Sequence, residues 1–229
     1  MPVLLRMRNK KEAVVLLSGG LDSATTLYLA RKQGFKCFCL IFDYGQRHRK
    51  EISSAKKIAQ SAGSKFQVVK VSLPWKGSSL LDKNINIPSA ASDGISGIPT
   101  TYVPARNIIF LSFALSCAEA MKAEAIFIGA HSQDYSGYPD CRPEFYQAFR
   151  KVDACGTKSG VEKKGVKIIT PLINKGKAEI IRLGNRLGVP FGETWSCYQG
   201  GKRPCGECDS CHYREKGFRE AKSFDPLLK

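Results

Sequence analysis

The sequence lacks a long hydrophobic run. None of its apolar stretches approaches the roughly 20 residues that cross a membrane. The apolar part of residues 1–11 is also too short for the core of a signal peptide. We therefore expect a cytoplasmic protein that makes no membrane contact. In that reducing compartment the nine cysteines predict metal ligands or buried thiols and exclude disulfides.

Two common nucleotide motifs are also missing, and acidic residues are few. The chain has neither a Gly-x-x-x-x-Gly-Lys-Ser/Thr loop nor a Gly-x-Gly-x-x-Gly turn. Its 36 lysines and arginines against 20 acidic residues give a net charge of +16. No aromatic residues alternate with the basic clusters, as they would on a platform for single-stranded nucleic acid. The charge indicates a solvated surface and leaves a nucleic acid or an acidic protein partner open.

A glycine turn is present between a predicted strand and a predicted helix. The apolar run 13–17 is followed by Ser18-Gly19-Gly20-Leu21-Asp22-Ser23 and then by a helical pattern over 24–32. The two glycines let the backbone turn tightly against a ligand. Free N–H groups at the start of the helix favour phosphate. The turn therefore predicts a nucleotide site, with an ordinary strand-to-helix turn as the alternative.

Predicted strands alternate with helices along most of the chain, which indicates a doubly wound, parallel, five-stranded α/β sheet. Ligands bind such sheets at the carboxyl ends of the strands, where the strand order reverses. We expect the first and fourth strands to be neighbours there. We also expect an ATP-binding α/β domain over 1–190, with a small metal-binding segment that ends in a helix, 191–229, packed on it. Further strands are predicted over 36–42, 66–71, 124–130 and 166–170.

Three other segments carry expectations about structure. Residues 108–120 are apolar on nearly every side and predict a buried helix. Residues 153–164 show no clear element. The stretch 72–101 has little periodicity and predicts either a cover over the substrate or a contact between subunits.

Residues 131–142 follow the fourth predicted strand and are rich in chemical groups. They hold two carboxylates, two tyrosines, a thiol and an arginine. A carboxylate accepts hydrogen bonds from the N–H groups of a guanine-like base, and a tyrosine offers a stacking face. The segment therefore predicts a site for a purine-like substrate.

Four cysteines near the C-terminus are separated by seven, two and two residues: Cys197, Cys205, Cys208 and Cys211. Such spacing lets four thiolates converge on one tetrahedral ion, and it predicts structural Zn²⁺ in a closed site that serves folding. An iron–sulfur cluster is the alternative. A ferredoxin-like run would have a further cysteine shortly after Cys211, and none is present there.

The glycine turn resembles the Ser-Gly-Gly-x-Asp-Ser signature of the PP-loop ATP pyrophosphatases. Other strings resemble the 7-cyano-7-deazaguanine synthase family, in order, from about residue 13 to 217. Ala105 stands where glycine is expected in many members of that family. The strings are Asp43-Tyr44-Gly45-Gln46-Arg47-His48, Val103-Pro104-Ala105-Arg106-Asn107, Ser136-Gly137-Tyr138-Pro139-Asp140-Cys141-Arg142, Thr170-Pro171-Leu172 and Lys177-Ala178-Glu179-Ile180.

The resemblance implies an ATP-dependent ligase that turns 7-carboxy-7-deazaguanine and ammonia into 7-cyano-7-deazaguanine. The reaction would pass through adenylated intermediates, with Mg²⁺ on the pyrophosphate, Asp22 as a candidate ligand and a homodimer as the assembly. We expect four residues to be catalytic: Asp22, Ser23, Lys177 and Arg106. The nucleotide would be contacted by Leu17, Ser18, Gly19, Gly20, Leu21, Asp22, Ser23, Ala24, Thr25, Thr26 and Leu27. The substrate would be contacted by Asp134, Tyr138, Asp140, Arg142 and Asn107.

Several alternatives stay open at this point. From the residues alone, Arg106 is equally well read as a salt bridge at a helix start and Lys177 as a solvated lysine. No residue stands out as a general base. Three rival functions are a tRNA-thiolating PP-loop enzyme, a relative that joins the activated deazapurine to a protein or nucleic-acid amine, and a zinc-bearing binding module without catalysis.

Overall fold

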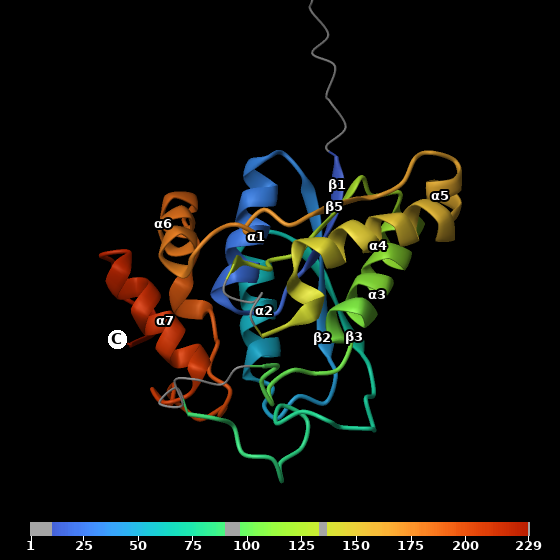
Figure 1. Cartoon of the computed structure of the whole chain (residues 1–229). Helices are drawn as coiled ribbons and strands as arrows, with labels where there is room; N and C mark the ends of the chain where they lie inside the picture. The colour runs from blue at the N-terminus through green and yellow to red at the C-terminus, as the bar shows by residue number, and fades with distance from the viewer. Residues whose placement is uncertain (1–10, 90–96, 133–136, 229) are drawn as a thin grey trace, which may run out of the picture.

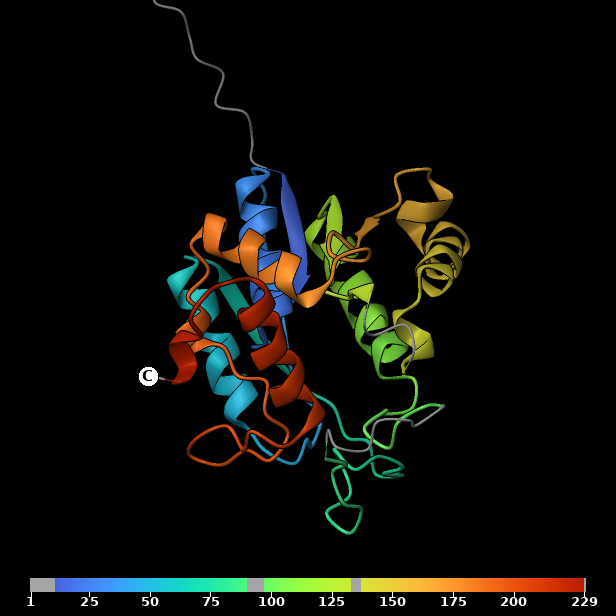
Figure 2. The same cartoon turned by 60° about the vertical axis from the view of Figure 1, so that its left-hand side comes forward.

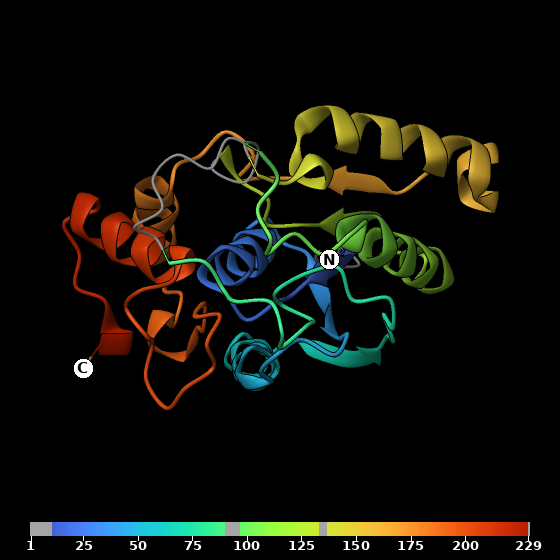
Figure 3. The same cartoon turned by 60° about the horizontal axis from the view of Figure 1, so that its bottom comes forward.

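The structure, a computed structural model, describes residues 11–89, 97–132 and 137–228. Its centre is a single five-stranded sheet in the order β3-β2-β1-β4-β5, with every pair of strands parallel. Helices cover both faces of the sheet (Figures 1 and 3). The predicted doubly wound α/β fold is confirmed. The strands are β1 (Glu12–Leu16), β2 (Lys36–Asp43), β3 (Lys65–Lys70), β4 (Ala125–Phe127) and β5 (Lys167–Ile169).

The helices fall into two layers. Helices α1, α2 and α6 lie on one face and α3 and α4 on the other, while α7 packs against the outer side of α6 (Figures 2 and 3). The α-helices are α1 (Leu21–Lys32), α2 (Lys50–Ser61), α3 (Arg106–Met121), α4 (Pro143–Gly156), α5 (Lys158–Val161), α6 (Lys177–Leu187) and α7 (Asp209–Glu220). Short 3-10 helices are η2 (Pro139–Cys141), η3 (Phe191–Glu193) and η4 (Pro226–Leu228).

The alternation of side chains along β1 divides the core in two. Ala13 and Val15 face the layer of α1, α2 and α6. Val14 and Leu16 face the layer of α3 and α4. Successive residues of a strand point to opposite faces, and all four side chains are buried because helices cover both faces. A strand of this kind has no polar face, as the continuous apolar run predicted.

Two expectations about the helical layer were wrong. In α3, Ile108 and Phe113 are each 43% exposed, so this helix buries one side only. The segment 153–164, for which no element was expected, holds the end of α4 and all of α5. The single turn of α5 is held by its cap, because the Thr157 hydroxyl accepts from the Gly160 N–H at 2.8 Å. A single helical turn is too short to show an apolar periodicity, so the sequence pattern did not reveal it.

A buried ion pair fastens the C-terminal segment. Arg214, on α7, donates to both carboxylate oxygens of Asp225 at 2.6 and 2.8 Å, and to the Thr194 hydroxyl at 2.7 Å. The pair therefore joins three parts of the chain beyond residue 190. The domain boundary at that residue stays a prediction. Within the described residues, no helix combines the length and the apolar character needed to cross a membrane.

Candidate functional site

A cavity of about 260 Å³ opens at the carboxyl ends of β1, β2 and β4. Strand β1 pairs with β2 on one side and with β4 on the other, so the cavity lies where the strand order reverses. The expectation that the first and fourth strands are neighbours is confirmed. The walls come from the turn after β1, the segments that follow β2 and β4, the start of α3 and the C-terminal segment around Ser196.

The glycine turn is held by its own serines. Ser18 Oγ donates to Ser23 Oγ at 3.0 Å, and Ser23 Oγ donates to the Gly20 carbonyl at 3.1 Å. Gly19 has φ of +90°, and a Cβ there would overlap the carbonyl oxygen of Glu51 on α2. Only glycine meets both conditions. The first N–H groups of α1, which have no partner inside the helix, start at this turn and favour an anion.

The eleven residues predicted to contact a nucleotide divide into two groups. Leu17, Ser18, Gly20, Asp22 and Ser23 line the cavity. The structure places the others among the buried residues and not on the cavity wall. Nucleotide contact by all eleven stays a prediction. They are Gly19, Leu21, Ala24, Thr25, Thr26 and Leu27.

Asp22, Lys177 and His131 meet at the cavity from three separate elements. Lys177 Nζ donates to both Asp22 carboxylate oxygens, at 3.0 and 2.9 Å, and lies 2.9 Å from His131 Nε2. Burial acts to raise the pKa of the Asp22 carboxyl, but Lys177 and His131 hold it well below its ordinary value. The carboxylate is therefore ionised, and Lys177 holds it through both of its oxygens.

Arg106 is the first residue of α3 and lies on the cavity wall. Its guanidinium donates to the Tyr44 hydroxyl at 3.4 Å, a long contact, and no carboxylate forms an ion pair with it among the described residues. Ala105 before it is left-handed, with φ of 56°, a conformation that costs an alanine about 1 kcal/mol. Among the described residues the helix-start salt bridge is therefore absent, and the guanidinium lies on the cavity wall.

The residues predicted to bind substrate are not all on the cavity wall. Tyr138 and Asn107 line it. Asp140 is buried and accepts the backbone N–H of Asn107 at 2.9 Å, so it fixes the start of α3. Arg142 is exposed and outside the lining, and Asp134 lies outside the described residues. Substrate contact by all five residues stays a prediction.

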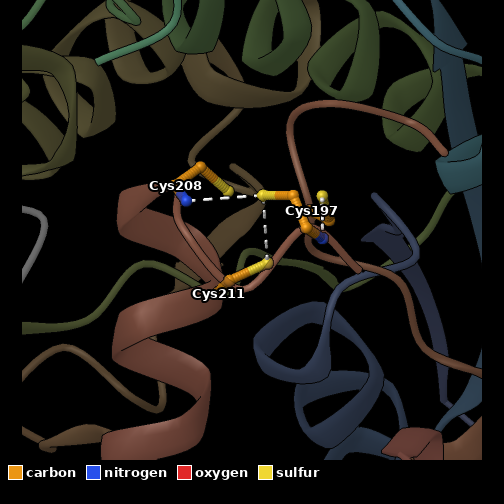
Figure 4. Close-up of side chains that lie close together, drawn as sticks. Cys197, Cys208 and Cys211 are labelled. Carbon is orange, nitrogen blue, oxygen red and sulfur yellow. Dashed lines mark hydrogen bonds between the residues drawn. The ribbon is translucent and has the colours of Figure 1, made fainter. Parts of the chain in front are cut away.

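The four C-terminal cysteines come together. Their sulfur atoms all lie within 4.8 Å of one another, and Cys197, Cys208 and Cys211 point toward a common centre (Figure 4). Four sulfurs about 2.3 Å from one tetrahedral ion would lie roughly 3.8 Å apart, close to the 3.9 Å between Cys205 and Cys211. Backbone N–H groups of Cys205 and Cys208 point at cluster sulfurs, both at 3.4 Å. The donor set fits a single metal ion.

The cysteine cluster also forms part of the cavity. Ser196 and Tyr198, on either side of Cys197, are lining residues. The Trp195 backbone N–H donates to the Gly19 carbonyl at 2.9 Å, and the Lys50 ammonium lies 3.7 Å from the centre of the Trp195 ring. The metal-ligand segment is therefore fastened directly to the glycine turn.

Several lining residues were not named as site residues from the sequence, although His131 belongs to the segment 131–142 that predicted a substrate site. Glu51 and His131 each stand shortly after the carboxyl end of a strand, β2 and β4, and that position is the signal that could have found them. Ser196 and Tyr198 reach the cavity only because the cysteine cluster folds against the turn. No local pattern marks them.

Comparison with known proteins places the chain in a family. The family model described as "Queuosine biosynthesis protein QueC" matches residues 12–222. The chain belongs to the QueC family. This QueC-family match includes the glycine turn, the cavity wall and all four clustered cysteines.

Two relatives of this QueC-family chain carry the same name. A protein of Nostoc sp. is 54% identical over 220 residues, which are 94% of this chain and 96% of the relative. One of Acetivibrio thermocellus is 55% identical over 218 residues, 95% and 97% of the two chains. Both are named 7-cyano-7-deazaguanine synthase. The structure of NMN synthetase from Francisella tularensis shares the fold alone, with a TM-score of 0.50 at 14% identity over 94% of this chain and 78% of that one.

Proposed function

We propose that this chain is a 7-cyano-7-deazaguanine synthase. It converts 7-carboxy-7-deazaguanine and ammonia to the nitrile, consumes ATP and acts in queuosine biosynthesis. The support is family membership together with relatives of that name that are 54 and 55% identical over nearly the whole chain. The observation that carries the proposal is a cavity with a glycine turn suited to anions at one side and, at another, an arginine that forms no ion pair with any described residue.

The glycine turn would hold the phosphates of ATP. Its free N–H groups and the Ser18 and Ser23 hydroxyls can donate to phosphate oxygens, and the positive end of the α1 dipole favours their charge. Lys177 can move from Asp22 to a phosphate, because its side chain is flexible and already lies on this wall. Asp22, once released, can bind the Mg²⁺ that accompanies ATP.

Arg106 would hold the carboxylate of the deazapurine. A partly buried guanidinium without an anion is well suited to bind one, and its planar fork matches a carboxylate. Tyr138 and Asn107 lie on the same wall and can contact the purine-like ring. The carboxylate oxygen can then attack the α-phosphorus of ATP, giving pyrophosphate and an acyl adenylate. The enzyme acts chiefly by positioning the two anions side by side.

The four cysteines would bind one structural Zn²⁺. A closed set of four thiolates suits zinc and leaves no position for a substrate. Cys197, Cys205, Cys208 and Cys211 would hold the ion, and its contribution is to keep the segment around Ser196 folded against the turn. Elemental analysis of the purified protein tests this assignment. One zinc per chain is expected, and iron in its place would contradict it.

The rival functions fit less well. A thiolating enzyme needs a catalytic cysteine pair outside the metal group. Cys37 and Cys39 are buried in β2, where burial raises the pKa of the Cys37 thiol to about 11. Cys141 alone of the described cysteines lines the cavity, so no pair meets there. A zinc-bearing binding module without catalysis would not explain the presence of the glycine turn. A macromolecular amine in place of ammonia is the remaining alternative for the acceptor.

Mass spectrometry of the reaction mixture tests the proposal. The purified protein is incubated with ATP, Mg²⁺, ammonium and 7-carboxy-7-deazaguanine. Formation of the nitrile together with AMP and pyrophosphate is the expected result. Formation of AMP together with the mass of the deazapurine added to a macromolecule would favour a macromolecular amine as the acceptor. A folded, metal-loaded sample that makes no AMP would overturn the assignment.

A further inference from the structure

The proposed reaction needs a proton acceptor. When ammonia attacks the acyl adenylate, the C–N bond forms, the C–O bond breaks and AMP leaves with the electron pair, while an N–H proton must depart. When the amide oxygen is adenylated by a second ATP, two N–H protons must leave as the third C–N bond forms and AMP departs. A positioned base typically accelerates such a transfer about 10² to 10⁴-fold.

Two of the three candidate bases are already occupied. Among the lining residues that the structure describes, the carboxylates are Asp22 and Glu51 and the imidazole is His131. Both oxygens of Asp22 accept from Lys177, which makes this carboxylate a weak base, and the Mg²⁺ that would replace Lys177 when ATP binds would occupy it in turn. His131 Nε2 lies 2.9 Å from the same ammonium and 3.6 Å from an Asp22 oxygen, so this imidazole belongs to the group around Asp22 that would face the Mg²⁺.

Glu51 is different in its surroundings. Its carboxylate takes part in no hydrogen bond or ion pair within the described residues, although it is only partly exposed. Burial raises the pKa of this carboxyl to about 7, while the positive charge of Arg106 opposes the rise. Tyr44, Tyr198 and Cys197 are the other ionisable groups close enough to interact with it.

Glu51 lies between the glycine turn and the cavity wall that carries Arg106. Its backbone carbonyl lies against Gly19 of the turn, in the first part of α2. Its side chain interacts electrostatically with Arg106, on the wall where the deazapurine carboxylate would bind. The α-phosphorus and the carboxyl carbon must meet between these two places. A free carboxylate is therefore located where protons are released.

We propose that Glu51 is the catalytic residue that accepts the N–H protons in the amidation and dehydration steps. This proposal depends on the synthase function proposed above. Glu51 takes one proton at a time and passes it to solvent through its exposed part. Attack of the substrate carboxylate on ATP releases no proton and needs no base, so the two kinds of step can be separated by experiment.

Glu51→Gln is the informative variant because it keeps the shape of the side chain and removes the base. With 7-carboxy-7-deazaguanine and ATP, we expect pyrophosphate release and an acyl adenylate detectable by mass spectrometry after rapid quenching. Amide and nitrile formation should slow at least about 100-fold, with the KM for ATP within about two-fold of the parent value. With the amide supplied directly, nitrile formation should slow in the same way.

Two further variants complete the test. Glu51→Asp keeps a carboxylate and should recover part of the rate. Glu162→Gln makes the same charge change at an exposed surface position and should match the parent protein. Nitrile formation at the parental rate in Glu51→Gln would overturn the role of Glu51 and leave the synthase intact. Loss of the acyl adenylate would overturn it too and assign Glu51 to nucleotide binding. A parent protein that makes no AMP would instead defeat the synthase proposal.

Discussion

Lys177 and Asp22 stand 155 positions apart in the chain and form the central contact of the cavity. Each was marked by the sequence for a separate reason, Asp22 as part of the glycine turn and Lys177 as part of a family string. Their pairing, and the arrival of His131 beside them, depends on three elements meeting at one edge of the sheet. Side-chain identity was predictable at this site, whereas the hydrogen-bonding partner was not.

Replacing Lys177 with methionine should destabilise the protein in a pH-dependent way. The folded-state pKa of Asp22 is depressed, so this pair stabilises the fold above the unfolded pKa of about 3.9 and loses that effect as the pH falls below it. In Lys177→Met the largely buried carboxylate loses its partner, at a cost of about 3 kcal/mol at pH 7. Urea unfolding at pH 7 and pH 3.5 measures this, and the difference between parent and variant should shrink at the lower pH.

Lys36→Met is the matched control. Lys36 forms an ion pair with Glu12 at 2.7 Å, but its side chain is 63% exposed. Such a surface pair contributes about 0.5 kcal/mol. Equal losses in the two variants at pH 7 would show that the Lys177 pair has no special weight in the fold.

The turn between β1 and α1 depends on the helix that packs behind it. The sequence predicted the strand, the turn and the helix correctly, because apolar runs and glycines are local signals. It could not predict that α2 presses its first turn against Gly19. The same limit explains α3, where an apolar run predicted burial but the sheet covers one side only. The local sequence pattern predicts whether a segment forms a helix or a strand, whereas its contacts depend on tertiary packing.

Gly19→Ala and Gly34→Ala separate two reasons for glycine in these elements. Both residues have a left-handed backbone, with φ of +90° and +89°, but a Cβ at Gly34 would meet nothing within 4 Å. We expect Gly34→Ala to cost about 1 kcal/mol from backbone strain alone. Gly19→Ala adds an overlap with the backbone of α2 and should cost about 3 kcal/mol or more.

Urea unfolding gives the two free energies, and isothermal titration with ATP gives the second readout. Gly34→Ala should bind ATP as the parent does, since Gly34 follows α1 at its far end from the cavity. Gly19→Ala should lose ATP binding in parallel with its stability. Normal ATP affinity in a folded Gly19→Ala protein would count against the turn as the phosphate site.

At the scale of the whole molecule, the cysteine cluster and the glycine turn are packed together as one unit. The spacing of the four cysteines predicted a metal group with a role in folding. It gave no sign that Ser196 and Tyr198 would complete the cavity, because this depends on how the C-terminal segment folds back over the sheet. The hydrogen bond from Trp195 to Gly19 and the stacking of Lys50 on the Trp195 ring make that contact.

Loss of the metal should therefore weaken ATP binding as well as stability. In Cys208→Ser we expect the metal content to fall from one ion per chain to near zero. We also expect the Kd for ATP to rise about ten-fold, a coupling of ordinary size between two sites. Trp195 is 3% exposed and Trp75 is 62% exposed, so in a Trp75→Phe background the emission should shift to the red as Trp195 meets water. Cys155→Ser removes an exposed thiol outside the cluster and should change neither readout. A metal-free Cys208→Ser protein that stays folded and binds ATP with the parental Kd would show that the cluster and the turn are independent.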